Sequence, residues 1–114
     1  MQALEGATLI TGAASGIGRA CAIAASKAGT DQLILIDLNS DGLTETAALC
    51  GNANVTTHAM NVADPEAWAT LEAEMPGLTH GVICAGVSDA VPITEMTFEA
   101  WRKVMSVNLD GAFL

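Results

Sequence analysis

A glycine-rich segment near the amino end of the chain constrains its fold more than any other feature. Residues 11–18 read Thr-Gly-Ala-Ala-Ser-Gly-Ile-Gly, directly after an apolar run at residues 7–10 and directly before a helical pattern. A turn in this position exposes backbone N–H groups and the positive end of a helix dipole, so it can hold a phosphate. Strand, turn and helix in this order predict a dinucleotide-binding unit. A tight turn without a ligand is the alternative interpretation.

The glycines of this segment have different expected roles. Gly12 ends the strand in a backbone conformation that a side chain would disfavour. Gly16 leaves bare backbone where a pyrophosphate approaches, and Gly18 lets the helix pack close to the sheet. The residues that recur at helical spacing in this helix, and that we expect on its buried face, are Ile17, Ala20, Cys21, Ala24 and Ala28. Arg19 is expected to be solvated, with an approach to the pyrophosphate as the alternative.

An acidic residue after the second apolar run indicates a ribose site. Residues 33–36 read Leu-Ile-Leu-Ile, which is typical of a buried strand, and Asp37 follows directly. Asp37 comes about 20 residues after Gly18, the offset at which dinucleotide folds place the carboxylate that binds the adenosine ribose. Such a carboxylate repels a 2′-phosphate, and neither Ser15 nor Leu38 is a basic residue that would attract one. The sequence therefore favours NAD over NADP, while a turn or capping role for Asp37 is the alternative.

Apolar runs alternate with helical patterns along the chain. The predicted strands are residues 7–10, 33–36, 55–59 and 81–84, and the predicted helices are residues 16–28, 42–50, 65–75 and one that begins at residue 98. Strands separated by helices pair in parallel through right-handed crossovers. The predicted fold is α/β, a Rossmann-type doubly wound parallel sheet of strand order 3-2-1-4, as one domain over residues 1–114. The carboxyl ends of the strands should meet at one crevice. The residues at those ends are Gly12, Asp37, Asn61 and Gly86.

Capping residues and apolar spacing complete the prediction for the helices. Asp41, Asp64 and Thr97 are the expected N-caps of the second, third and last helices. The residues expected to face the core from the last helix are Phe98, Trp101, Val104 and Met105.

Charge and cysteine usage exclude several classes of function. The 13 acidic and 4 basic residues give a net charge of −9, which disfavours nucleic acid and anionic membranes as partners. No apolar stretch approaches the roughly 20 residues that cross a bilayer. The cysteines Cys21, Cys50 and Cys84 form neither a disulfide framework nor a metal-binding spacing. These features predict a cytoplasmic protein without a metal.

The glycine-rich segment resembles the cofactor turn of the short-chain dehydrogenase/reductase family, whose members move hydride between NAD(P) and an alcohol or ketone. Residues 11–18 match its Thr-Gly-x-x-x-Gly-x-Gly pattern. Asn61-Val62 stands where the family usually has Asp-Val, which implies an adenine contact through the Asn61 amide oxygen. Residues 83–86 read Ile-Cys-Ala-Gly where the family usually has Asn-Asn-Ala-Gly, so Gly86 keeps the close approach to the cofactor and the sheet-stiffening amides are missing. The predicted cofactor-binding residues are Gly12, Ser15, Gly16, Ile17, Gly18, Asp37, Leu38, Asn61, Val62, Cys84, Ala85 and Gly86.

The resemblance implies the N-terminal, cofactor-binding half of a family member. Val107-Asn108 resembles the family's Val-Asn pair, which implies that Asn108 is catalytic and helps to hold a proton-relay water through its backbone. From the residues alone, Asn108 is better explained as a polar residue that interrupts a buried helix. The family's catalytic serine and Tyr-x-x-x-Lys pair lie further on, this chain has no tyrosine, and neither Lys27 nor Lys103 fits the motif. The chain is therefore expected to be truncated and inactive alone, because the general acid/base is missing.

Two other functions stay open. One is a non-catalytic nucleotide-binding module or partner subunit, which the missing acid/base favours. The other is a methyltransferase-like domain that binds an adenosyl cofactor, which the three residues between Gly12 and Gly16 fit poorly. In each case the fourth strand would be a hydrophobic sheet edge. Self-association or a partner that covers this edge is therefore expected.

Overall fold

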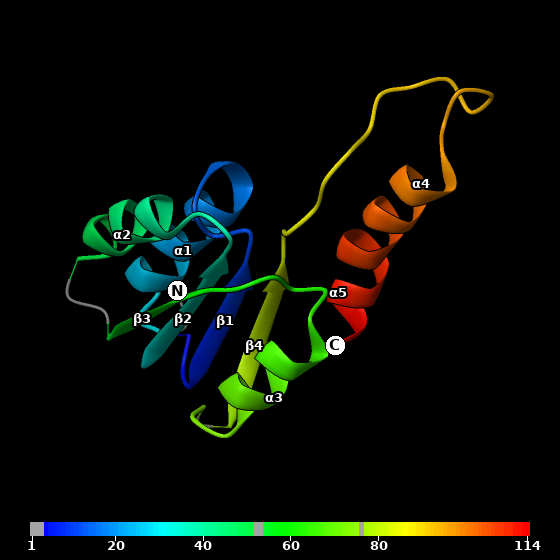
Figure 1. Ribbon diagram of the computed structural model, residues 1–114. Helices are drawn as coiled ribbons and strands as arrows, with labels where there is room; N and C mark the ends of the chain where they lie inside the picture. Colours follow the sequence, from blue (N-terminus) through cyan, green and yellow to red (C-terminus); the bar gives the residue numbers. More distant parts are fainter. Residues whose placement is uncertain (1–3, 52–53, 76) are drawn as a thin grey trace.

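A parallel sheet of four strands organises the fold (Figure 1). The computed structural model describes residues 4–51, 54–75 and 77–114. The strands are β1 (Ala7–Thr11), β2 (Gln32–Asp37), β3 (Val55–Ala59) and β4 (Leu78–Ile83). Their order is β3-β2-β1-β4 and all three pairings are parallel. The predicted α/β fold and strand order are confirmed. They could be predicted because the alternation of strands and helices leaves few other topologies.

Helices cover both faces of the sheet, as the doubly wound prediction requires. α1 (Gly16–Lys27) and α2 (Ser40–Leu49) pack in one hydrophobic cluster with Leu33 and Leu35. α3 (Pro65–Glu72) packs in a second cluster with Ile34 and Ile36. Successive strand residues point to opposite faces, so an uninterrupted apolar β2 supplies both clusters. All four of these side chains are buried.

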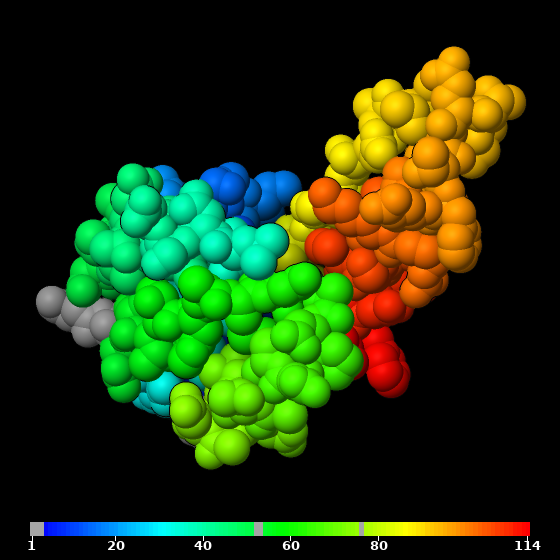
Figure 2. Space-filling model, in the orientation of Figure 1, coloured from blue at the N-terminus to red at the C-terminus, as the bar shows by residue number. Residues whose placement is uncertain are grey.

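The chain after β4 leaves the sheet. An extended segment leads to α4 (Phe98–Met105), which continues into a π-helical turn, η1 (Ser106–Asp110), and the short α5 (Gly111–Phe113). Figure 2 shows the beginning of this part projecting from the body of the molecule. This part of the chain contacts the body of the molecule again at Gly111, which is buried. A Cβ on Gly111 would lie 2.7 Å from a methyl of Val62, so the two residues are in close contact. None of the helices in the described part of the chain has the length and apolar character to cross a bilayer.

The prediction that Phe98 and Trp101 face the core from α4 is wrong. Phe98 is 76% exposed and Trp101 is 45% exposed, whereas Val104 and Met105 are half-buried. The spacing of these residues does describe one helix face. α4, however, lies beyond the open edge of β4, so that face has little of the sheet beneath it (Figure 1).

Two further details of the helices differ from the predictions. α2 is capped by Asn39, whose side chain accepts a hydrogen bond from Gly42 N, and Asp41 lies instead in its first turn. The fully buried residues of α1 are Gly18, Ala22 and Ala25. Of the expected set, Cys21 packs against the core while half-buried, and Ile17, Ala20 and Ala24 are exposed. Gly18, and not the larger Ile17, lies against the end of β1. The buried face of α1 is therefore shifted by one residue from the predicted face. The expected caps Asp64 and Thr97 are confirmed.

Candidate functional site

A cavity of about 400 Å³ opens at the carboxyl ends of the strands. Its walls come from the turns after β1, β2, β3 and β4 and from η1. All the residues predicted to contact a cofactor line it. They are Gly12, Ser15, Gly16, Ile17, Gly18, Asp37, Leu38, Asn61, Val62, Cys84, Ala85 and Gly86. Met60, Val87 and Val107 complete the lining; they are chain neighbours of predicted residues, which is the signal that could have found them.

The glycine turn has the backbone shape that its sequence predicts. Gly12 and Gly16 have φ angles of +68° and +53°, which side chains disfavour. A Cβ on Gly12 would lie 2.7 Å from the carbonyl carbon of Cys84, so the turn lies directly against the end of β4. A Cβ on Gly16 would meet no atom within 4 Å. The turn therefore offers bare backbone and open space at the N-terminus of α1, where an anionic group fits.

The N-terminus of α1 supplies the donors for such a group. Ser15 is the N-cap residue, is extended (φ −161°, ψ 172°), and makes no side-chain capping bond. The first backbone N–H groups of a helix have no partner within the helix. With Ser15, Gly16 and Ile17 exposed, these donors and the Ser15 hydroxyl are accessible from the cavity.

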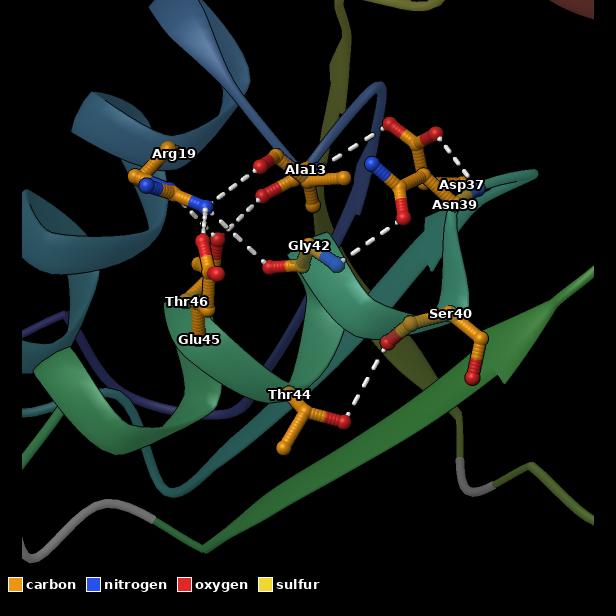
Figure 3. Close-up of polar contacts among 10 residues, drawn as sticks. Ala13, Arg19, Asp37, Asn39, Ser40, Gly42, Thr44, Glu45 and Thr46 are labelled. Atoms are coloured by element: carbon orange, nitrogen blue, oxygen red, sulfur yellow. Dashed lines mark hydrogen bonds and ion pairs between the residues drawn. The ribbon is translucent and has the colours of Figure 1, made fainter.

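Asp37 combines its expected position with a turn-forming role. Its Oδ2 accepts a hydrogen bond from Ala14 N and its Oδ1 accepts one from Asn39 N, both at 3.0 Å (Figure 3). An ionised carboxylate has about four acceptor positions, so these two bonds leave capacity for a ligand. The two interpretations made from the sequence are therefore compatible.

The turn after β3 is held in place by its own side chains. The Asn61 Oδ1 accepts a hydrogen bond from Ala63 N at 2.9 Å, and Asn61 is exposed. Val62 is buried, and its carbonyl oxygen accepts from Trp68 Nε1 at 2.8 Å. Trp68 thus packs α3 against this turn. The amide oxygen expected to contact an adenine already has one partner and retains its second lone pair.

The turn after β4 is fixed by a hydroxyl that sequence reasoning missed. The Thr11 Oγ1 accepts hydrogen bonds from Cys84 N at 3.2 Å and Ala85 N at 3.1 Å. These bonds connect the ends of β1 and β4, the region in which the resemblance implied missing amides. Only the position of Thr11 at the end of a strand hinted at this role.

The cysteines of the described chain are all free thiols. Burial raises the pKa of Cys84 because it desolvates the thiolate, and this is the largest cause. The charge of the neighbouring Cys21 and its hydrogen bond with Cys84 raise the pKa further. Burial also raises the pKa of Cys50. Cys84 therefore contributes a neutral, polarisable group to the cavity rather than a thiolate. Within residues 4–51, 54–75 and 77–114, no three His, Cys, Asp or Glu side chains come together as metal ligands would.

Asn108 contacts the loop beside the cavity. Its Oδ1 accepts from Val87 N at 2.8 Å and its Nδ2 donates to the Val87 carbonyl at 2.9 Å. A Cβ on Gly86 would lie 3.3 Å from the same Oδ1. The side chain of Asn108 thus attaches η1 to the loop after β4. Its expected catalytic role stays a prediction.

Replacing Asn108 with alanine should release this loop. Each neutral hydrogen bond contributes about 1 kcal/mol and Asn108 makes two with Val87, so hydrogen exchange of the Val87 amide should accelerate roughly five- to thirtyfold. The control Ser106→Ala removes only a bond to Lys103 O within the helix and should leave that amide unchanged. Equal exchange at Val87 in both variants would mean that the Asn108 contact does not hold the loop in solution.

The sequence and fold of this chain are similar to those of known proteins. Residues 6–114 match the family described as short chain dehydrogenase. The chain is 35% identical to D-threitol dehydrogenase of Mycolicibacterium smegmatis, over 93% of this chain and 43% of that protein. It is 35% identical to galactitol 2-dehydrogenase (L-tagatose-forming) of Cereibacter sphaeroides, over 96% and 44%. The crystal structure of L-sorbose reductase from Gluconobacter frateurii, complexed with NADPH and L-sorbose, superposes with a TM-score of 0.88 and 27% identity, over 99% and 45%. The chain spans about half the length of the curated relatives it matches.

Proposed function

The chain belongs to the short chain dehydrogenase family, and we propose that it binds a nicotinamide dinucleotide in the cavity above its strands. The convergence of every predicted cofactor-binding residue on one cavity carries this proposal. The pyrophosphate lies on the glycine turn and the N-terminus of α1, and the adenosine ribose on Asp37. Asn61 and Val62 lie beside the adenine, and Gly86 lies toward the nicotinamide. Membership of this family argues against the methyltransferase-like alternative.

We propose NAD rather than NADP as the cofactor. The half-buried carboxylate of Asp37 lines the cavity and would repel a 2′-phosphate. None of the described residues that line the cavity is a lysine or arginine. The nearby Arg19 is engaged by backbone carbonyls and by Glu45. The similar L-sorbose reductase is complexed with NADPH, and titration with both dinucleotides distinguishes the two cofactors.

When bound, the dinucleotide supplies a hydride donor or acceptor for an alcohol or ketone, and the residues of this chain bind and orient it. The relatives named for threitol, galactitol and sorbose support a polyhydroxylated alcohol or ketone as the substrate class. These 114 residues contain no tyrosine to act as the family's acid/base. We therefore propose that these residues form the cofactor-binding part of an oxidoreductase and give no turnover by themselves. A nucleotide-binding module or partner subunit, with no catalytic role at all, is the second candidate, and the missing acid/base favours it.

Titration of the purified, folded chain with NADH and NADPH tests the proposal. We expect an increase in nicotinamide fluorescence with NADH and at least tenfold weaker binding of NADPH, because the charge of Asp37 opposes the 2′-phosphate. A folded chain that binds neither dinucleotide would overturn the proposal. S-adenosylmethionine serves as a control ligand that should not compete.

A turnover assay addresses the second part of the proposal. NAD⁺ with a mixture of secondary alcohols should give no NADH above background, because no group in the chain fits the family's proton-transferring tyrosine. NADH formation that scales with the chain's concentration would contradict this and would assign catalysis to residues now regarded as binding groups.

We also propose that another strand or chain covers β4. Within the described residues β4 pairs with β1 alone, and its Leu78 and Ile83 are 45% and 59% exposed. An unpaired edge with apolar side chains favours association. A second copy of this chain or a separate partner fits equally, and sedimentation at several concentrations distinguishes them. The proposed cytoplasmic location rests on the free cysteines.

A further inference from the structure

Arg19 in the first turn of α1 contacts the backbone of two other segments. Its Nη2 donates hydrogen bonds to the carbonyl oxygens of Ala14 at 2.6 Å and Gly42 at 3.3 Å, and contacts Oε2 of Glu45 at 3.1 Å (Figure 3). Its Nε donates to Thr46 Oγ1 at 2.9 Å. The side chain is 28% exposed, so the expectation of a solvated arginine is wrong.

These contacts close a ring of hydrogen bonds that contains Asp37. Ala14 donates its N–H to Asp37 and accepts from Arg19 at its carbonyl. Gly42 accepts from Arg19 at its carbonyl and donates its N–H to Asn39 Oδ1. Asn39 donates its N–H to Asp37 Oδ1. Each member of the ring is therefore held on two sides, and Arg19 is the member that connects the glycine turn to α2.

The ring depends on close approach of α2 to the glycine turn. A Cβ on Gly42 would lie 2.7 Å from Ala14 Cβ and 3.0 Å from Ala14 O, so only glycine permits this distance. The guanidinium presents several donors in one plane and can bond both carbonyls together, which a single ammonium group does less well. Glu45 is 69% exposed. An exposed ion pair contributes little, so the two carbonyl contacts carry the effect.

The hydroxyl of Thr46 strengthens the same connection from inside the protein. Thr46 is fully buried, and its Oγ1 donates to Ala13 O at 2.8 Å while it accepts from Arg19 Nε. Two carbonyls of the turn are thus held, that of Ala13 by Thr46 of α2 and that of Ala14 by Arg19 of α1. Arg19 participates in both connections.

We propose that Arg19 is a positioning residue that sets the preference for NADH over NADPH. It is absent from the lining of the cavity and acts through the ring, by holding Ala14 and α2 so that the Asp37 carboxylate keeps one orientation. This inference rests on the proposed function. A carboxylate held in one orientation accepts stronger hydrogen bonds from the ribose hydroxyls of NADH than a mobile carboxylate does. It also repels the 2′-phosphate of NADPH more strongly. Loss of Arg19 therefore weakens NADH binding more than NADPH binding.

The test compares Arg19→Met with the unchanged 114-residue chain by titration with NADH and NADPH. We expect the Kd for NADH to rise about tenfold and the Kd for NADPH to change less than about threefold. Arg19→Lys keeps the charge and one donor group, and should recover part of the preference. Lys27→Met removes a positive charge from the exposed end of the same helix and should leave both Kd values unchanged.

An equal loss of affinity for both dinucleotides in Arg19→Met would show a merely structural role and would overturn the inference. The same holds if Arg19→Met changes the NADH/NADPH ratio in an Asp37→Ala background, because the effect must pass through that carboxylate. If circular dichroism shows that Arg19→Met does not fold, Arg19→Lys decides, and an unchanged ratio there overturns the inference. Failure of the unchanged chain to bind either dinucleotide is a different result, which removes the proposed function and this inference together.

Discussion

Replacing Gly18 with alanine is expected to destabilise the protein by about 3 kcal/mol or more, the largest effect that any single methyl group should have here. The added Cβ would overlap the carbonyl oxygen of Gly12, and would lie 2.5 Å from the carbonyl carbon of Gly12 and 3.0 Å from Ala13 N. These atoms belong to the backbone, so no side-chain rotation relieves the overlap. α1 would have to move away from the end of β1, which also displaces the phosphate-binding turn. Urea denaturation followed by circular dichroism measures the change.

Two other glycines separate steric overlap from other effects of adding a methyl group. A Cβ on Gly81 in β4 would meet no atom within 4 Å other than those of its chain neighbours, and Gly81 has no positive φ. Gly81→Ala should therefore change stability by less than about 0.5 kcal/mol. Gly16 has equal space but a φ of +53°, so Gly16→Ala should cost roughly 1–2 kcal/mol from backbone strain alone. If Gly18→Ala unfolds at the same urea concentration as Gly81→Ala, α1 and the glycine turn are not in close contact.

The fold could be predicted because its determinants are local in the sequence. The apolar run at residues 33–36, the glycines at positions 12, 16 and 18, and the alternation of helix and strand each constrain a short segment. Right-handed crossovers then allow few ways of joining the segments. The strand order β3-β2-β1-β4 follows from these constraints.

The contacts that refine the site could not be predicted because they join distant residues through backbone atoms. Thr11 accepts hydrogen bonds from residues 84 and 85, and Arg19 donates to the carbonyl of Gly42. A backbone carbonyl is the same group in every residue, so no sequence pattern indicates which one a side chain will reach. The exposure of Phe98 and Trp101 has a similar origin. Helical spacing defines a face, and only the position of α4 beyond the sheet edge determines what that face contacts.

The predicted cofactor residues meet at one cavity, and their roles stay predictions until a dinucleotide is bound. Convergence of four strand ends was predictable, because parallel strands place their carboxyl ends at the same edge. Asn108 shows the limit of this reasoning. The resemblance gave it a backbone role with a water, while the structure shows a side-chain contact with Val87.

Removal of the Asp37 carboxylate should have the largest effect on ligand binding. Asp37→Ala loses the acceptor proposed for the ribose and also the bonds to Ala14 N and Asn39 N. We expect the affinity for NADH to fall by roughly 10- to 100-fold. This corresponds to the loss of one to two charge-assisted hydrogen bonds, which together contribute roughly 1–3 kcal/mol. NADPH affinity should fall less or rise, because the charge that opposes its 2′-phosphate is gone. Isothermal titration of both dinucleotides measures the two effects.

Two variants determine whether the charge or the local geometry is responsible. Asp37→Asn keeps one acceptor oxygen and the size of the side chain, so it should retain more NADH affinity than Asp37→Ala, while its NADPH affinity should again fall less or rise. Asp41→Asn removes the same charge from the first turn of α2, where Asp41 is exposed, and should alter neither Kd by more than about twofold, because solvent screens it. If Asp37→Ala and Asp41→Asn shift both dinucleotides equally, Asp37 acts only through the overall charge of the protein. The carboxylate would then serve the turn between β2 and α2, and the ribose contact would have to be sought elsewhere in the cavity.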